Sequence, residues 1–446
     1  MSPLISSKAG TLKGRAPIPG DKSISQRALM LAASATGESV IQGLLESEDV
    51  RATAGALQSF GVPMEMDKDG RWHVFGRGVG GLAEPDGVLG LGNSGTGARL
   101  LLGLAAAHPF TIFMTGDASL RSRPMDRVMG PLSRFGARFT SRTGGRLPIA
   151  MEGTGNPLPL AEKLTVASAQ VKSAILLAGL NTPGETTVIE PLPTRDHTEI
   201  MLRQLGAQVK CQAVEGGAQA ITVTGQPELN AANITVPSDL SAAAFPLIAA
   251  LLVPGSQIEF QDVGVNPLRT GLLDCLSEMG AHIDVQNLGA GDGGEEMANI
   301  SATSGPLKGI EVPPERVPAM IDEFPILAMA AACADGPTRF MGVGELRVKE
   351  SDRIGAIADG LKACGVSLQE DEGSLIINGS GVAPAGGASV ASRMDHRIAM
   401  SFAVLGMVSD APIRIDDASP IATSFPGFVP LMNGLGGDLH LEEDAR

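Results

Sequence analysis

A pattern of eight residues that recurs six times limits the possible folds more than any other feature of the chain. Each copy reads apolar, two variable residues, apolar, glycine, small, variable, apolar, which is typical of a helix that ends at a left-handed glycine before a strand. The copies centre on Gly61, Gly136, Gly206, Gly280, Gly365 and Gly436. By subtraction, these glycines lie 75, 70, 74, 85 and 71 residues apart. This spacing predicts one structural unit repeated six times.

A second series of segments interleaves with these glycines. Six stretches of small apolar residues, each opened by polar residues, are typical of buried helices, and they start 39, 43, 38, 41, 43 and 41 residues before the next glycine. The starts lie near Lys22, Asn93, Ser168, Asp239, Asp322 and Asp395. Short strands are expected between the helices, at residues 186–189, 221–223, 258–260, 375–377 and 413–415. Each repeat is therefore expected to be a mixed α/β unit.

The size of the repeat predicts two globular lobes rather than an elongated array. A repeat of about 70 residues with its own strands is too large for the familiar helical solenoids. A chain of 446 residues also exceeds what one hydrophobic core usually supports. We expect three units in a lobe of residues 20–238, and three in a discontinuous lobe of residues 1–19 and 239–446.

Composition and charge exclude several classes of function. The net charge of −15 argues against nucleic acid or an anionic membrane as a general partner, because both need an extended basic surface. No apolar run is long enough to span a bilayer, and the four cysteines and six histidines show no metal-ligand spacing. We therefore expect a cytoplasmic protein without a bound metal. A small anionic ligand would need a local cluster of cations.

The polar helix starts supply such a cluster. The positive ends of several buried helices, packed side by side, would attract anions. The first start carries Lys22, Ser23 and Arg27, and the glycines of the second, around Gly95, would let backbone N–H groups approach an oxyanion. Further polar candidates at helix starts or in comparable segments are Arg99, Arg123, Ser168, Gln170, Lys172, Arg195, Lys349, Arg353 and Arg397.

Each of these residues also has a purely structural interpretation. Ser168, Asp239 and Asp395 could be ordinary helix N-caps. Lone arginines are usually solvated, and the sequence KESDR at 349–353 could be an exposed charged turn. The carboxylates of Asp322 and Glu323 are flanked by apolar residues, and a carboxylate at the mouth of a buried helix is a plausible general base.

Seven segments together resemble the EPSP synthase family over nearly the whole chain. They are GDKSISQR at Gly20, LGNSGTGAR at Leu91, GDASLRSRPM at Gly116, ASAQVKSAILLAGL at Ala167, TRDHTE at Thr194, ELRVKESDR at Glu345 and DHRIAMSFAV at Asp395. The resemblance implies a fold of two lobes, each of three βαβαββ units, with the active site between them. It also implies transfer of the enolpyruvyl group of phosphoenolpyruvate to the 5-hydroxyl of shikimate 3-phosphate by a monomeric enzyme that needs no cofactor.

The resemblance also assigns roles to individual residues. Shikimate 3-phosphate would be held by Lys22, Ser23, Arg27, Ser168, Gln170, Arg195, Asp322 and Lys349. Phosphoenolpyruvate would be held by Lys22, Gly95, Arg123, Gln170, Arg353 and Arg397, because planar guanidinium groups suit carboxylate and phosphate. Asp322 would accept the hydroxyl proton. Glu350 and Lys22 are the candidates for proton transfer at the methylene carbon, with Glu350 placed first.

Three positions depart from the pattern of many family members. Gln26 replaces a common His, Glu345 a common Asn, and Thr423 a Lys that many members direct at phosphoenolpyruvate. The chain thus resembles the subgroup that lacks this lysine. It keeps Gly95, where some herbicide-tolerant members of that subgroup have Ala, so glyphosate is expected to compete with phosphoenolpyruvate.

Two alternatives remain open at this level. The sister enzyme that transfers enolpyruvyl to UDP-N-acetylglucosamine normally has Asn where this chain has Ser23, and no cysteine here stands in a recognisable equivalent of its reactive loop. A catalytically silent α/β scaffold would also share the repeats. The intact charged residues in all seven segments argue against that scaffold.

Overall fold

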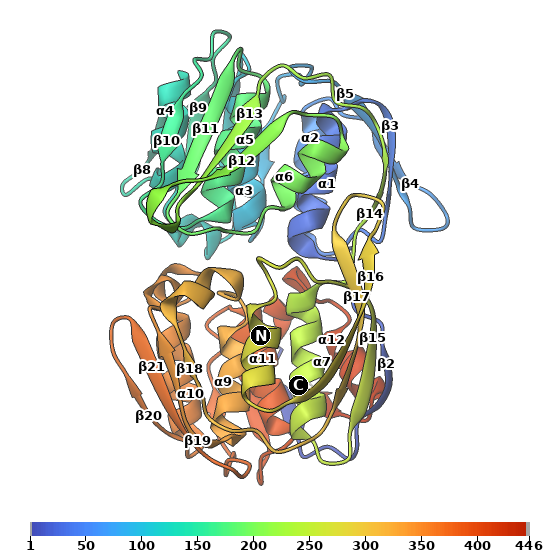
Figure 1. Cartoon of the computed structure of the whole chain (residues 1–446), viewed down its shortest axis with the longest axis vertical. Helices are drawn as coiled ribbons and strands as arrows, with labels where there is room; N and C mark the ends of the chain where they lie inside the picture. Colours follow the sequence, from blue (N-terminus) through green and yellow to red (C-terminus); the bar gives the residue numbers. More distant parts are fainter. Residues whose placement is uncertain (1, 443–446) are drawn as a thin grey trace. The chain divides into compact units, whose positions relative to one another are not determined.

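The structure, a computed structural model, describes residues 2–442 and divides into two compact units. The N-terminal unit comprises Gly20–Pro237 and the short segment Ala290–Glu295. The C-terminal unit comprises Ser238–Gly289 and the described residues of 1–19 and 296–446. Figure 1 shows helices and sheets in each of them.

The N-terminal unit contains six α-helices, twelve strands and two short 3₁₀ turns. The helices are α1 (Lys22–Ser34), α2 (Glu48–Ser59), α3 (Gly95–Ala106), α4 (Asp126–Phe135), α5 (Ala169–Leu180) and α6 (His197–Gln204). The strands are β3 (Thr36–Gln42), β4 (Met64–Met66), β5 (Trp72–Arg77), β6 (Val88–Gly90), β7 (Thr111–Thr115), β8 (Arg138–Arg142), β9 (Arg146–Glu152), β10 (Ala161–Lys163), β11 (Glu185–Glu190), β12 (Val209–Ala213), β13 (Gln219–Thr224) and β14 (Asn233–Thr235). The turns are η1 (Leu120–Ser122) and η2 (Glu215–Gly217).

The described residues of the C-terminal unit repeat this composition, with three 3₁₀ turns. The helices are α7 (Leu240–Leu252), α8 (Gly271–Glu278), α9 (Phe324–Cys333), α10 (Arg353–Ala363), α11 (His396–Gly406) and α12 (Phe428–Gly434). The strands are β1 (Leu4–Ser7), β2 (Lys13–Ala16), β15 (Gln257–Gly264), β16 (His282–Ala290), β17 (Glu296–Thr303), β18 (Glu311–Val312), β19 (Asp335–Met341), β20 (Ser367–Glu370), β21 (Ser374–Ser380), β22 (Ser389–Val390), β23 (Ile413–Ile415) and β24 (Asp438–Leu441). The turns are η3 (Pro314–Ala319), η4 (Gly344–Val348) and η5 (Ser419–Thr423).

Each unit has three four-stranded sheets with the same pairing pattern. In the sheet β6-β7-β9-β8, β6 runs parallel to β7, and the other neighbours are antiparallel. The chain passes through β6, the buried helix α3, β7, the helix α4, and the hairpin β8–β9. The same order recurs around α5 and α9. The sheets that contain β3, β15 and β23 repeat the pairing with one strand from elsewhere in the chain, which confirms the predicted βαβαββ repeat and its six copies.

Three sheets are completed by strands from distant parts of the chain. In the N-terminal unit, β14 runs parallel to β3, with Ile234 opposite Ile41. In the C-terminal unit, β2 runs parallel to β15, and β1 lies between β23 and β24. The first residues of the chain therefore belong to the same sheets as residues that follow Ser238.

Both predicted series of helix signals are confirmed. The buried helices begin at Lys22, Gly95, Ala169, Leu240, Phe324 and His396, within two residues of the expected starts. All six repeat glycines have positive φ, between +81° at Gly61 and +117° at Gly136, as a left-handed helix stop requires. The expected strands also form, as parts of β11, β13, β15, β21 and β23.

The buried helices pack closely because their facing residues are small. In α3, a Cβ at Gly103 would lie 2.2 Å from the carbonyl oxygen of Ala174 in α5. The N-terminal unit has one hydrophobic core, to which α1, α3 and α5 contribute, and α7, α9 and α11 contribute to the core of the C-terminal unit. Close packing side by side brings the first turns of helices into one neighbourhood within each unit.

Within residues 2–442, no helix combines the length and apolar character needed to cross a membrane.

We predict that Gly103→Ala lowers the free energy of unfolding by about 1–3 kcal/mol or more, because the added methyl group must push α3 away from the backbone of α5. Gly55→Ala is the matched control. Gly55 is exposed within α2 and a Cβ there meets nothing within 4 Å, so this change stabilises the protein by up to about 1 kcal/mol. Urea denaturation of both variants gives the comparison, and equal stabilities would contradict the close packing.

Candidate active site

Lys22 is held in place at the first turn of α1. Asp21 caps this helix by accepting a hydrogen bond from the backbone N–H of Ile24, at 2.9 Å. The ammonium of Lys22 lies 3.1 Å from Oδ2 of Asp49, in the first turn of α2. The Lys22 side chain is 17% exposed, so it is oriented by its carboxylate partner and still reachable by a ligand. Nothing in the sequence distinguished Asp49 from other acids near a helix start.

The guanidinium of Arg27 joins α1 to α5 and α6. Its Nε donates to Oγ1 of Thr198 at 2.8 Å, and Nη2 donates to Oγ of Ser173 at 2.9 Å. Its Nη1 donates to the carbonyl of Ser23 at 3.0 Å. Burial lowers the pKa of Arg27 to about 10, and the nearby positive charge of Arg195 adds to this effect. The carboxylates of Glu199, Asp21 and Glu295 act on the pKa of Arg27 in the opposite direction.

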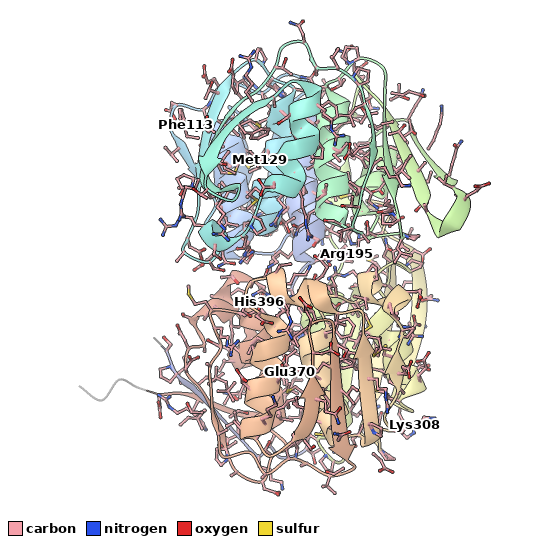
Figure 2. All side chains as sticks on the ribbon, turned by 90° about the vertical axis from the view of Figure 1, so that its left-hand side faces the viewer. Phe113, Met129, Arg195, Lys308, Glu370 and His396 are labelled. Carbon is pink, nitrogen blue, oxygen red and sulfur yellow. The ribbon has the colours of Figure 1, made fainter. Side chains whose placement is uncertain are left out.

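Arg195 follows a turn that is fixed by a buried ionic cluster. Lys172 lies 3.1 Å from Glu190 and 2.8 Å from Glu199, and it donates to the carbonyl of Thr194 at 3.0 Å. Burial alone would lower the pKa of Lys172, but the two carboxylates outweigh this and raise it. Thr194 also donates through Oγ1 to Glu190, at 2.6 Å. Thr194, the residue before Arg195, is thus held through both its backbone carbonyl and its hydroxyl. Figure 2 shows Arg195 at the edge of the N-terminal unit.

Two arginines face the first residue of α3. A Cβ at Gly95 would lie 2.9 Å from Nη1 of Arg123 and 3.0 Å from Nη1 of Arg99. Arg123 is held by Oδ1 of Asn93 at 2.5 Å and by Oγ of Ser119 at 3.0 Å. The absent side chain at Gly95 therefore leaves room beside two guanidinium groups and a helix N-terminus, which suits a carboxylate or phosphate.

Gln170 forms hydrogen bonds with two residues of α3, Arg99 and Thr96. It accepts a hydrogen bond from Nη1 of Arg99 at 2.8 Å and donates to Oγ1 of Thr96 at 2.9 Å. Arg99 stood among the polar residues of the second helix start, but it was not assigned to a substrate. Its place four residues after Gly95, one helical turn away, was a usable signal that it shares the face of that residue.

Two polar residues have mainly structural contacts. Ser168 caps α5 by accepting from the backbone N–H of Val171 at 3.4 Å, as its alternative interpretation expected. Gln26 is fully buried, and its Nε2 lies 2.5 Å from Oγ of Ser94 and 3.2 Å from Oγ1 of Thr53. Gln26 thus connects α1 to α2 and to the start of α3.

The C-terminal unit gathers three carboxylates around the guanidinium of Arg353. Its Nε donates to Oδ2 of Asp395 at 2.8 Å, Nη1 to Oδ1 of Asp322 at 3.2 Å, and Nη2 to Oε2 of Glu350 at 2.5 Å. Burial alone would lower the pKa of Arg353, but the charges of Asp395, Glu350 and Asp322 reverse this and raise it. The alternative of an exposed charged turn is wrong for Arg353, which begins α10 and is 0% exposed.

Arg397 lies close to two acidic residues, Asp322 and Glu323. Its Nη1 donates to the carbonyl of Asp322 at 3.0 Å and lies 4.0 Å from Glu323. Asp395 caps α11 by accepting from the backbone N–H of Arg397, and its carboxylate also binds Arg353. One residue thus fixes a helix start and a neighbouring cation, a double role that its sequence position did not reveal.

Lys349 and Thr423 lie at the ends of two 3₁₀ turns in the C-terminal unit. Lys349 follows η4, between Val348 and Glu350. Thr423 closes η5 and donates through Oγ1 to the carbonyl of Pro420 at 2.8 Å. The hydroxyl of Thr423 is therefore engaged with its own turn.

Comparison with known proteins supports the inference from these motifs. The family model for EPSP synthase (3-phosphoshikimate 1-carboxyvinyltransferase) matches residues 7–432. Two curated relatives are named 3-phosphoshikimate 1-carboxyvinyltransferase. The protein from Paramagnetospirillum magneticum is 60% identical over 98% of both chains, and that from Rhodospirillum rubrum is 57% identical over 98% of both.

Solved structures agree with the sequence relatives. An EPSP synthase from Acinetobacter baumannii is 44% identical and superposes with a TM-score of 0.87, covering 99% of this chain and 100% of that one. The enolpyruvyl transferase NikO from Streptomyces tendae, at 18% identity and a TM-score of 0.77 over 99% of both chains, shares the fold. The chain belongs to the EPSP synthase family.

Proposed function

We propose that the side chains described above let this chain transfer the enolpyruvyl group of phosphoenolpyruvate to the 5-hydroxyl of shikimate 3-phosphate, with release of phosphate. The observation that carries the proposal is the space beside Gly95 at the first turn of α3, where Nη1 of Arg123 and Nη1 of Arg99 both face the position of the absent side chain. Two guanidinium groups and a helix N-terminus around one space suit a phosphate or carboxylate, in a chain whose net charge is −15. Both substrates of the family reaction are phosphorylated anions.

Shikimate 3-phosphate binds the residues around α1 and α5. Arg27 and Arg195 suit its phosphate, since guanidinium groups bind phosphate oxygens in pairs. The hydroxyl of Ser23 and the amide of Gln170 suit its hydroxyl groups. The full set that we assign to this substrate is Lys22, Ser23, Arg27, Ser168, Gln170, Arg195, Asp322 and Lys349.

Phosphoenolpyruvate binds where the backbone and several guanidinium groups converge. The space left by Gly95 next to Arg123 admits an oxyanion, and Arg99 adds a second guanidinium there. The full set that we assign to this substrate is Lys22, Gly95, Arg123, Gln170, Arg353 and Arg397. Because Thr423 replaces a lysine, we place the chain in the subgroup that lacks this cation.

The reaction proceeds by addition and elimination. Asp322 accepts the proton of the 5-hydroxyl as its oxygen attacks C2 of phosphoenolpyruvate, and the methylene carbon gains a proton to become a methyl group. Loss of a methyl proton then expels phosphate and restores the double bond. Glu350 transfers the proton at this carbon, with Lys22 as the second candidate. Arg353 touches both Asp322 and Glu350, so one fixed cation orients the two carboxylates.

Two further features of the proposal concern the whole chain. We propose that it acts as a monomer in the cytoplasm and needs no cofactor. We also propose two lobes, one of residues 20–238 and one of 1–19 with 239–446. The compact units meet at Pro237 and Ser238, and the segment Ala290–Glu295, whose Glu295 contacts Nδ1 of His197 at 2.7 Å, lies with the N-terminal unit.

Lys22→Met tests the proposed reaction most directly. We expect kcat/KM for phosphate release to fall by about 100-fold or more, because a positioned charge that stabilises the transition state is lost. The melting temperature should stay unchanged. Phosphate release that depends on both substrates is the measurement, and unchanged turnover in the variant would refute the assignment.

Gly95→Ala tests the assignment of the phosphoenolpyruvate pocket. Glyphosate should compete with phosphoenolpyruvate in the unaltered protein. The new methyl group would lie 2.9 Å from Arg123, so KM for phosphoenolpyruvate and Ki for glyphosate should each rise by about tenfold or more, roughly 1.4 kcal/mol. Gly130→Ala is the control, since a Cβ at Gly130 in α4 meets nothing within 4 Å. Steady-state kinetics that show no competition at millimolar glyphosate would disprove the assignment.

Thr194→Val tests whether the buried cluster positions Arg195. Loss of the hydrogen bond to Glu190 should raise KM for shikimate 3-phosphate about 5–10-fold, the effect of one hydrogen bond, with little change in kcat. Thr194→Ser should restore the ordinary KM. Thr222→Val, which removes a bond between two threonines of β11 and β13, is the control for general loss of a hydroxyl. Equal KM values in all variants would show that the cluster only stabilises the fold.

A further inference from the structure

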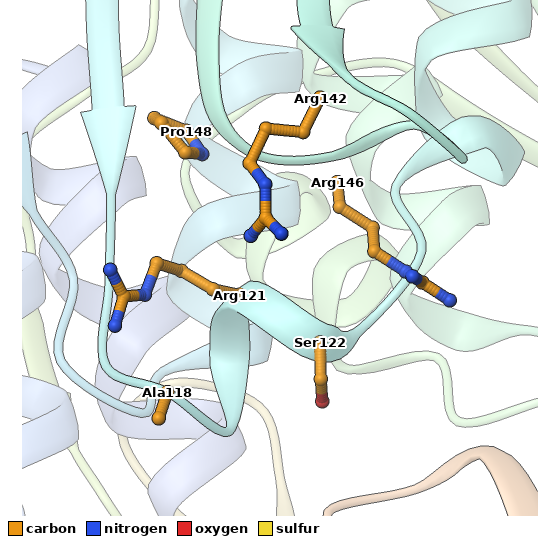
Figure 3. A pocket seen from close by; sticks show the side chains of 6 residues that line it. All are labelled: Ala118, Arg121, Ser122, Arg142, Arg146 and Pro148. Atoms are coloured by element: carbon orange, nitrogen blue, oxygen red, sulfur yellow. The ribbon is translucent and has the colours of Figure 1, made fainter.

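A second group of arginines lines a cavity in the N-terminal unit, apart from the residues assigned to substrates. The cavity has a volume of about 540 Å³. Its lining comes from η1 and the segment just before it, the end of β8 and the start of β9, and consists of Ala118, Arg121, Ser122, Arg142, Arg146 and Pro148. Figure 3 shows the guanidinium of Arg142 directed between Arg121 and Arg146 in this view.

None of these three arginines forms an ion pair with a carboxylate of residues 2–442. The side chain of Arg121 donates only to the carbonyl of Asp117 at 3.3 Å, and that of Arg142 only to the carbonyl of Leu147 at 3.2 Å. The side chain of Arg146 has no hydrogen bond or ion pair to any of the described residues. No acidic side chain of the described part of the chain lines the cavity.

Nearby arginines behave differently. Arg134 in α4 forms an ion pair with Glu162, and Arg138 in β8 forms one with Glu152 at 3.5 Å. The chain has 49 acidic and 34 basic residues, so carboxylate partners are abundant. The three arginines at this cavity have no carboxylate partner among the described residues, and they create a local positive potential in an acidic protein. Such a potential attracts anions.

We propose that this cavity binds a small organic molecule that carries a multiply charged phosphate group. Three guanidinium forks match the several oxygens of a diphosphate or a phosphate monoester. The volume of about 540 Å³ lies within the range of roughly 300–1,000 Å³ that is usual for small-molecule pockets, so it accommodates more than a bare phosphate. Ala118, Pro148 and the hydroxyl of Ser122 offer contacts to the organic part.

The occupant acts on the proposed phosphoenolpyruvate site through η1. Arg121 lines the cavity, and Arg123, two residues later, faces Gly95. The backbone N–H of Arg123 donates to the carbonyl of Leu120 at 3.1 Å, so both arginines are held by one short turn. A ligand that fixes Arg121 changes the freedom of Arg123, and the coupling of the two sites is reciprocal. This coupling rests on the proposed function, whereas binding in the cavity does not.

Titration calorimetry with inorganic pyrophosphate at constant ionic strength tests the binding. We expect the intact chain to have one more pyrophosphate site than the double variant Arg142→Ala/Arg146→Ala, and each single variant to weaken that site about tenfold. Arg138→Ala, an exposed arginine of β8 with an acidic partner, should keep the site. Phosphate release by the double variant should be unchanged, because neither residue is assigned to a substrate.

The calorimetry can also overturn the proposal. Equal stoichiometry and affinity in the intact chain and the double variant would overturn the proposal, as would absence of pyrophosphate binding at millimolar concentrations. If Arg138→Ala weakened pyrophosphate binding equally, the binding would depend only on general surface charge, and the proposal would also be overturned. Milder changes, Arg142→Gln and Arg146→Gln, repeat the test if the double variant melts at a lower temperature.

Kinetics separate the coupling from the binding. Pyrophosphate should change KM for phosphoenolpyruvate more in the intact chain than in the double variant. In the double variant, only direct competition at the substrate site remains. Bound pyrophosphate with no such difference would disprove the coupling and leave the binding site standing. Absence of phosphate release in the intact chain would instead count against the proposed function.

Discussion

The close packing of small-residue helices is the constraint on which the rest of the structure depends. Because α3 has Gly103 where α5 presents its backbone, the two helices approach nearer than larger side chains would allow. Their first turns then lie together, and the cations that these turns carry or face become neighbours. The proposed anion site thus draws on residues that are scattered through the sequence, such as Arg27, Arg99 and Arg195.

Concentrated positive charge must be compensated before a substrate arrives. The chain does this differently at each position: one carboxylate for Lys22, two for Lys172, and three for Arg353. Asp395 serves both a helix terminus and Arg353, so a single carboxylate stabilises two features. Fixed partners keep each cation oriented, which lowers the entropy that binding would otherwise cost.

The sequence predicted the repeats, the helix starts and the glycine stops, because periodicity and helix-terminus chemistry are local. It did not predict Asp49 or the cluster around Arg353, because most of these contacts join residues that lie far apart in the sequence. The capping role of Ser168 was anticipated, but the second role of Asp395 was not. Likewise, no pattern indicated that residues 290–295 lie with the N-terminal unit, since a short excursion of this kind depends on tertiary contacts such as that between His197 and Glu295.

The position of β1 has a consequence for the order in which the protein can fold. Leu4 lies opposite Leu441, so this strand leaves the ribosome long before its partners β23 and β24 are made. Residues 20–237, by contrast, contain almost a whole unit in one continuous stretch and can collapse during synthesis. β1 therefore stays without these two partners until β23 and β24 have been synthesised. The sheet of β22, β23, β1 and β24 can therefore close only after β24 has been made.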